Sequence, residues 1–188
     1  TTGDGEVNAV NGVSFSVEEG ETLAIVGGGI IGAYLITKDP FWMMSGALGG
    51  IFCAASGLDL WYPGTAFALG FLGGVVIPYS HKLITSWGID DAVGAVSVHG
   101  TCGLIGVMAT GILLGGYPPP VEGIPAITFT GQLVGAIAMV LLGFIPGYVV
   151  SWILKQCGIL RVSDAIQNYG IDNAEIATPS YPEFQRSQ

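Results

Sequence analysis

One histidine stands deep inside an apolar stretch of this chain, where its ring could bind or pass a proton. His99 lies in the stretch 92–117, which contains no Asp, Glu, Lys or Arg. At helical spacing, Ala95 precedes it by one turn and Gly103 follows it by one turn, so small residues flank the ring and leave space for something narrow. A neutral imidazole has one donor and one acceptor nitrogen and titrates near physiological pH. The spacing alone fits a histidine that faces a cavity or a structural one that bonds across a helix interface.

Two carboxylates, Asp90 and Asp91, come directly before this stretch. Carboxylates at the start of a helix accept hydrogen bonds from its free amides and favour its positive end. We therefore expect a helix to begin near residue 92, with both aspartates at its start.

A second motif that could do chemistry is a glycine pattern, G-x-G-x-x-G, formed by Gly27, Gly29 and Gly32 after an apolar run. It resembles a dinucleotide-binding fingerprint, which also requires a strand–turn–helix unit and an acidic residue about 20 positions further on. That distance falls in an apolar stretch near Cys53, so a soluble nucleotide-binding enzyme is the weakest hypothesis. We prefer the interpretation that Gly28 and Gly32 allow helices to pack closely.

The composition indicates that these elements lie in lipid. The 188 residues are 51% hydrophobic and 10% charged, whereas soluble domains are about a quarter charged. Only five Lys and Arg and a net charge of −9 argue against nucleic-acid binding. Three scattered cysteines suggest neither a metal site nor a disulfide framework, and we expect no cofactor.

The apolar stretches predict an all-α polytopic membrane protein whose bundle occupies residues 28–155. A spanning helix needs about 20 apolar residues, and the candidates are 41–58, 64–84, 92–117 and 127–154, with a partial span at 22–37. Glycine pairs at i, i+4 occur in every stretch and predict close packing. The pairs are Gly28/Gly32, Gly46/Gly50, Gly70/Gly74, Gly111/Gly115, Gly131/Gly135 and Gly143/Gly147.

Positive charges predict the orientation, because short cytoplasmic loops retain Lys and Arg. When the chain is threaded through these spans, Lys38, Lys82 and Lys155 fall on one side. The tail 156–188 is therefore predicted to be cytoplasmic. His81, beside Lys82, is expected to be an interfacial residue in a cytoplasmic loop.

The first residues follow a different pattern. Residues 5–27 alternate polar and apolar side chains and favour strands. They resemble the opening strands of an ABC transporter ATPase domain, but Ala33 and Tyr34 stand where the phosphate loop of that family has Lys and Ser or Thr. We expect 1–27 to be a foreign or fused strand segment that does not bind ATP.

Four sequence segments resemble the ammonium transporter family, the Amt/Mep/Rh superfamily. They are VHGTCGLIGVMATGI at 98–112, preceded by Asp90 and Asp91, SGALGGIFCAASGLDLWYP at 45–63, FTGQLVGAIAMVLLGF at 129–144 and LRVSDAIQNYGID at 160–172. In that family eleven spans form two inverted halves, and subunits assemble as trimers. The resemblance implies that this chain is the last four full spans plus a remnant of the seventh.

The resemblance also assigns roles to individual residues. It implies that His99 is the second pore histidine, with Ala95 and Gly103 beside it, and that Asp90 and Asp91 lie at the helix start near the cytoplasmic vestibule. Ser45 stands where the family has Asn. Gly94 and Val96 replace a common Asp and Phe, so the vestibule is expected to be altered.

The expected function is ammonium or ammonia transport across the plasma membrane, not enzymatic catalysis. The first half, with the other pore histidine, is absent from this chain, so we expect that the chain alone does not conduct. The join near residue 27 suggests a recombinant, truncated or misassembled reading frame. The implied partners are ammonium, the lipid bilayer, two further copies in a homotrimer and a nitrogen-regulatory signalling protein at the tail. The alternative is a non-conducting membrane module that assembles with other subunits.

Overall fold

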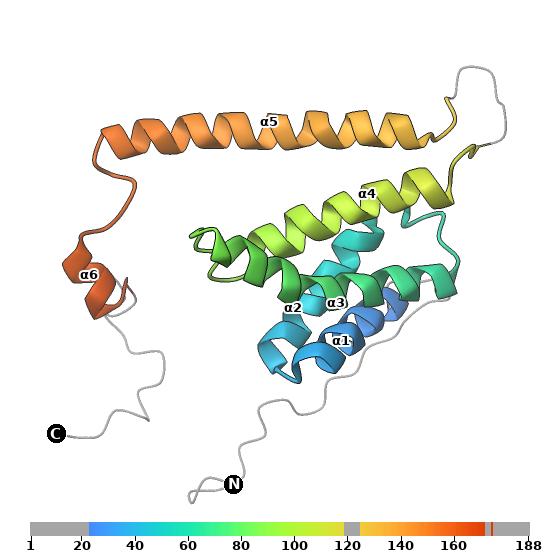
Figure 1. Cartoon of the computed structure of the whole chain (residues 1–188), viewed down its shortest axis with the longest axis horizontal. Helices are drawn as coiled ribbons and strands as arrows, with labels where there is room; N and C mark the ends of the chain where they lie inside the picture. The colour runs from blue at the N-terminus through green and yellow to red at the C-terminus, as the bar shows by residue number, and fades with distance from the viewer. Residues whose placement is uncertain (1–22, 119–124, 172–173, 175–188) are drawn as a thin grey trace, which may run out of the picture. The chain divides into compact units, whose positions relative to one another are not determined.

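Helices make up every regular element of the residues that the structure describes, which are 23–118, 125–171 and 174 (Figure 1). This computed structural model confirms the predicted all-α class, since no strand occurs among those residues. The chain divides into two compact units, one ending at Ala136 and the other beginning at Ile137.

Three glycine-rich helices pack against one another in the first unit: α1 (Leu23–Thr37), α2 (Pro40–Ala54) and α3 (Pro63–Ser86). Both α2 and α3 begin with a proline, whose fixed φ suits the first turn and which has no amide to leave unpaired. The Asp39 carboxylate caps α2 by accepting a hydrogen bond from the Phe41 amide at 2.9 Å.

The glycines of these helices bring the backbones into direct contact. A Cβ added to Gly28 would lie 2.5 Å from the Phe67 carbonyl oxygen of α3, and one added to Gly46 would lie equally close to the Gly29 carbonyl oxygen. A Cβ on Gly74 would also overlap the Gly29 carbonyl. The predicted packing role is thus confirmed for the pairs Gly28/Gly32, Gly46/Gly50 and Gly70/Gly74.

The next helix begins as a π-helix, Val96–Thr101, and continues as α4, Cys102–Leu113. It packs on α2 and α3 through a buried cluster of Cys53, Ile77, Val98 and Cys102. The predicted start near residue 92 is wrong, because the chain first makes a turn in which the Gly94 amide bonds to the Asp91 carbonyl at 2.9 Å. Gly94 has φ +72°, a conformation that glycine adopts without strain.

Three helices are long and apolar enough to cross a membrane in the part of the chain that the structure describes: Pro63–Ser86, Val96–Leu113 and Phe129–Gln156. At 1.5 Å per residue they measure about 36, 27 and 42 Å, against about 30 Å of hydrocarbon. The predicted full span at 41–58 is shorter than expected, because α2 has 15 residues and gives way to a 3₁₀ turn at Ala55–Gly57. The predicted partial span at 22–37 is the 15-residue α1.

Helix α5 (Phe129–Gln156) begins in the first unit and continues into the second. In its first turns, Phe129 and Gln132 lie against Gly111 of α4. An added Cβ on Gly135, Gly143 or Gly147 would meet no atom within 4 Å, so the predicted packing role of these α5 glycines stays a prediction. Beyond α5, the Ser163 hydroxyl caps the short helix α6 (Asp164–Tyr169) by accepting from the Ile166 amide.

The predicted N-terminal strand segment lies mostly outside the described residues. Its last five residues, 23–27, form the start of α1, so the expectation that strands extend to Gly27 is wrong. The glycine motif at Gly27, Gly29 and Gly32 is also helical and has no loop that could cradle a phosphate. Gly29 and Gly32 instead face the backbones of α2 and α3.

Candidate functional site

The π-helical segment Val96–Thr101 carries His99. In a π-helix the backbone hydrogen bonds span five residues instead of the four of an α-helix, and such segments often mark functional sites. Ser97 and Val98 anchor the segment, being 0% and 3% exposed, whereas the His99 side chain is exposed. The segment therefore turns its histidine away from the core of the first unit.

One aromatic ring fixes the His99 imidazole. The Phe52 ring of α2 meets it edge to face, with ring centroids 4.2 Å apart and planes at 72°. Such a contact restrains the orientation of the ring. Both nitrogens stay available for a polar partner or a passing proton.

The two small residues predicted beside His99 lie on uncovered surface. Ala95 is exposed and Gly103 is half-buried, and a Cβ added to Gly103 would meet no atom within 4 Å. The first unit thus leaves open space along the side of the helix that carries these residues. Their role as pore residues stays a prediction.

Asp91 holds the start of the π-helical segment. Its carboxylate accepts hydrogen bonds from the Val96 amide at 3.0 Å, from the Ser97 amide at 3.3 Å and from the Ser97 hydroxyl at 3.2 Å. Burial raises the pKa of this carboxyl, but these hydrogen bonds and the nearby His81 outweigh it and bring the pKa below its usual value. Asp91 is therefore an ionised cap that is only 4% exposed.

The other two predicted site residues lie apart from this cap. Asp90 is exposed, although it neighbours Asp91 in sequence. Ser45 is 7% exposed, and its hydroxyl donates to the Phe41 carbonyl one turn earlier in α2. It lies about two helical turns from Phe52, the residue of α2 that touches His99. A vestibule role for either residue stays a prediction.

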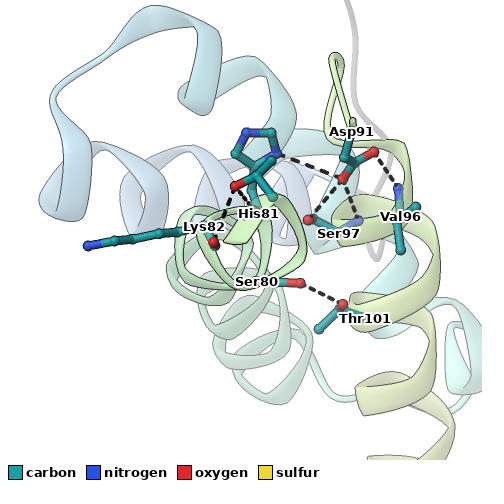
Figure 2. A network of polar contacts seen from close by, with 8 residues as sticks. Ser80, His81, Lys82, Asp91, Val96, Ser97 and Thr101 are labelled. Carbon is teal, nitrogen blue, oxygen red and sulfur yellow. Dashed lines mark hydrogen bonds and ion pairs between the residues drawn. The ribbon is translucent and has the colours of Figure 1, made fainter. Parts of the chain in front are cut away.

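Sequence reasoning missed the position of His81, which lies within α3 and not in a loop (Figure 2). Its ring packs edge to face on Trp42 of α2, with centroids 4.9 Å apart. Its Nδ1 is buried, has no hydrogen-bond partner and lies 3.8 Å from Asp91 Oδ2. No spacing rule could have found this cluster, since it joins two helices and the connection before a third.

A second polar contact joins α3 to the π-helical segment, and it starts from Ser80, the residue before His81. The hydroxyls of Ser80 and Thr101 are 2.7 Å apart, and Figure 2 shows this pair below the Asp91 cluster. Thr101 closes the π-helical segment that Asp91 opens. Both ends of the segment are thus tied by polar side chains.

No metal site accompanies this cluster in the described ranges 23–118 and 125–171, where no three His, Cys, Asp or Glu residues gather closely enough to hold an ion. What the arrangement offers chemically is an exposed imidazole, restrained by an aromatic ring, on a helix whose start is fixed by an ionised carboxylate.

Comparison with known proteins agrees with the sequence resemblance. The sequence profile of the Ammonium Transporter Family matches residues 21–181, a range that includes the last residues of the predicted N-terminal segment. Ammonium transporter Amt1 of Methanocaldococcus jannaschii is 34% identical over 175 residues, which cover 92% of this chain and 44% of that protein. Ammonium transporter Amt2 of the same organism is 34% identical over 163 residues, covering 86% and 38%.

A third relative, ammonium transporter Amt2 of Archaeoglobus fulgidus, is 31% identical over 150 residues, covering 74% of this chain and 32% of that protein. The chain thus spans less than half the length of these relatives. With a family match over most of its residues, and helices of membrane-spanning length and composition, this chain belongs to the ammonium transporter family.

Proposed function

We propose that this chain is the C-terminal half of an ammonium transporter and that His99 lines its pore. The observation that carries the proposal is the open surface around His99, where Phe52 restrains the ring and Gly103 leaves room beside it. The family match and the names of the relatives support ammonium as the cargo.

The chemistry of the imidazole suits this cargo. Ammonium gives up a proton at the pore entrance, and neutral ammonia then crosses a narrow apolar lumen. A neutral His99 can accept a hydrogen bond at one ring nitrogen and donate one at the other, and an imidazole can relay a proton between its two nitrogens. The second imidazole of the pore would come from the first half of the transporter.

The proposed setting is the plasma membrane, with the tail after α5 in the cytoplasm. Lys38 follows α1, Lys82 lies near the end of α3, and Lys155 lies in the last turn of α5. Successive spans alternate in direction, so these three positions share one side, which the charge rule makes cytoplasmic. A homotrimer and a signalling protein at the tail complete the proposal.

Uptake of radiolabelled methylammonium tests the proposal in a strain that lacks its own ammonium transport. The chain is expressed alone and together with a first half from a relative, and its presence in the membrane is checked by immunodetection. We expect uptake only for the pair. His99→Ala should abolish it, and Gly103→Val should reduce it by narrowing the lumen, since a Cβ at this position meets no atom within 4 Å.

Ile112→Ala is the matched control, because Ile112 lies on the same helix and is 66% exposed. It should leave uptake unchanged. Absence of uptake from a pair that reaches the membrane would contradict the proposal and favour the non-conducting module. Full uptake with His99→Ala would refute the pore role of His99.

A further inference from the structure

We propose that His81 is a proton-responsive positioning residue, which fixes the start of the π-helical segment carrying His99 when its own ring is protonated. The device acts within the first unit, at the end of α3 that carries Lys82. Its consequence for transport rests on the function proposed above.

The geometry places an unsatisfied ring nitrogen opposite a carboxylate (Figure 2). His81 Nδ1 is buried without a hydrogen-bond partner, and it lies 3.8 Å from Asp91 Oδ2. Trp42 holds the ring in this position from the α2 side. A buried polar atom without a partner is costly, so this arrangement calls for a form of the ring that can use the carboxylate.

Protonation supplies that form. A neutral ring has a bare acceptor at Nδ1 or must spend its single proton there, whereas the imidazolium has N–H donors at both nitrogens and a positive charge. Because hydrogen bonds hold the Asp91 carboxyl ionised, its pKa being lower than usual, the carboxylate is present to receive that donor above about pH 4. The ion pair then strengthens as the ring takes up its second proton.

Few other charges act on this ring. Helices α1 and α2 contain no charged residue, and Asp39 and Lys38, in their connection, are exposed. The Asp39 carboxylate is engaged by the Phe41 amide. On its own helix the neighbour is the exposed Lys82.

From the following connection, the π-helical segment and the start of α4, the titratable groups are Asp90, Asp91, His99 and Cys102. Asp90 and His99 are exposed, and Cys102 donates to the Gly73 carbonyl. Among the described residues, the charged group that reaches the His81 ring is thus Asp91.

Asp91 passes the effect to His99 through the backbone. Its two oxygens bind the amides of Val96 and Ser97, the first residues of the π-helical segment. Ser97 is fully buried and precedes His99 by two positions, so a change in the cap displaces the turn that carries the pore ring. Protonated His81 holds Asp91, and Asp91 holds the start of the segment.

Nuclear magnetic resonance on the ¹⁵N-labelled full chain in lipid nanodiscs tests this proposal without any transport assay. From about pH 5 to 8, the Val96 and Ser97 amide resonances should shift with the same midpoint as the His81 Cε1–H resonance. Their hydrogen exchange, corrected for intrinsic pH dependence, should be about fivefold slower at the acid end.

Two variants and a control sharpen the result. His81→Asn and Asp91→Asn should each abolish the pH response of these amides, and His99→Asn, which removes the other histidine, should preserve it. The proposal would be overturned if the Val96 and Ser97 amides did not respond to pH or followed the midpoint of His99. These midpoints are compared within the wild-type chain, so the test holds even if a variant fails to fold. This experiment measures no uptake, so its result is independent of the methylammonium assay that tests the transport proposal.

Discussion

The helices α1, α2 and α3 and the segment from Asp91 to Thr101 are held in opposite ways. The helices touch backbone to backbone at glycines, and carbonyls of one fill the place of a missing Cβ on the next. The segment is held by side chains: a carboxylate at its start, a hydroxyl pair at its end and one ring against another between them.

Because of this difference, the packed helices and the segment should tolerate different kinds of substitution. The glycine contacts leave no space for one added carbon, and no charge takes part in them. Around Gly103, just after the segment, an added carbon meets nothing, but the segment itself depends on ionised and hydrogen-bonded groups. The packed helices thus do not tolerate larger side chains at their glycines, whereas the segment they carry depends on the protonation of its side chains.

A methyl group added at Gly29 should have the largest effect. In Gly29→Ala the new Cβ overlaps the Gly46 carbonyl, so α1 and α2 must separate. Overpacking typically costs 1–3 kcal/mol, and a clash between two backbones should lie at or above the upper end, at about 3 kcal/mol. The free energy of unfolding in detergent, followed by circular dichroism, measures the loss.

Gly103→Ala is the matched control for this comparison. Its new Cβ has open space, and replacing glycine inside a helix should stabilise the chain by about 0.5–1 kcal/mol. Equal destabilisation by the two substitutions would contradict the distinction between the packed helices and the open surface.

Much of this scaffold could be predicted from sequence, because its signals are local. Apolar length predicts α3 and α5, and glycine spacing predicts the contacts at Gly28, Gly46 and Gly70. The length of α2 was overestimated, since apolar composition continues through the 3₁₀ turn where the α-helix ends. The start of α1 at Leu23 agrees with the partial span predicted at 22–37, whereas the strand pattern assigned to 5–27 runs too far.

Removal of the Asp91 cap should have the next largest effect, and only on the segment. Asp91→Ala leaves the Val96 and Ser97 amides without their acceptor and should cost about 1–2 kcal/mol. Hydrogen exchange at these two amides should show the loss most clearly. Asp90→Ala, the adjacent exposed aspartate, should change little.

The same carboxylate predicts a response to acid. Its pKa is lowered in the folded chain, so its stabilising contribution is complete above about pH 4 and is lost as pH falls through the folded value. Unfolding free energies measured from pH 5 downwards should fall more steeply in the wild type than in Asp91→Asn. Parallel pH profiles would show that Asp91 is not the ionised cap described above.

The site was less predictable than the scaffold because its contacts join distant parts of the chain. His99 and Asp91 are visible in the sequence through their type and spacing. The Phe52 ring on His99 and the His81 ring on Trp42 depend on how α2 and α3 are rotated about their axes, which no local pattern specifies. The π-helical turn at Val96 is likewise set by the cap and the packing around it.

Removal of the Phe52 ring should loosen His99 with a moderate effect on stability. Phe52→Leu keeps an apolar side chain but loses the edge-to-face contact, which is worth about 1 kcal/mol. The His99 ring resonances should move towards free-histidine values and report faster ring motion. Phe67→Leu on α3 serves as the control, since Phe67 is 40% exposed and lies outside the ring contacts found in the described residues. If this variant shifted the His99 resonances equally, the Phe52 contact would not be what restrains His99.

The smallest effect is expected at the end of the segment, where the Ser80 and Thr101 hydroxyls meet at 2.7 Å. A double-mutant cycle with Ser80→Ala and Thr101→Val isolates their interaction, which should be about 0.5 kcal/mol because the pair is partly exposed. The coupling should not change between pH 5 and 8, in contrast to the Asp91 end of the segment, because hydroxyls do not titrate there. A coupling that follows pH would mean that protonation at His81 reaches both ends of the segment, so that the whole turn carrying His99, and not only its start, responds to the proton.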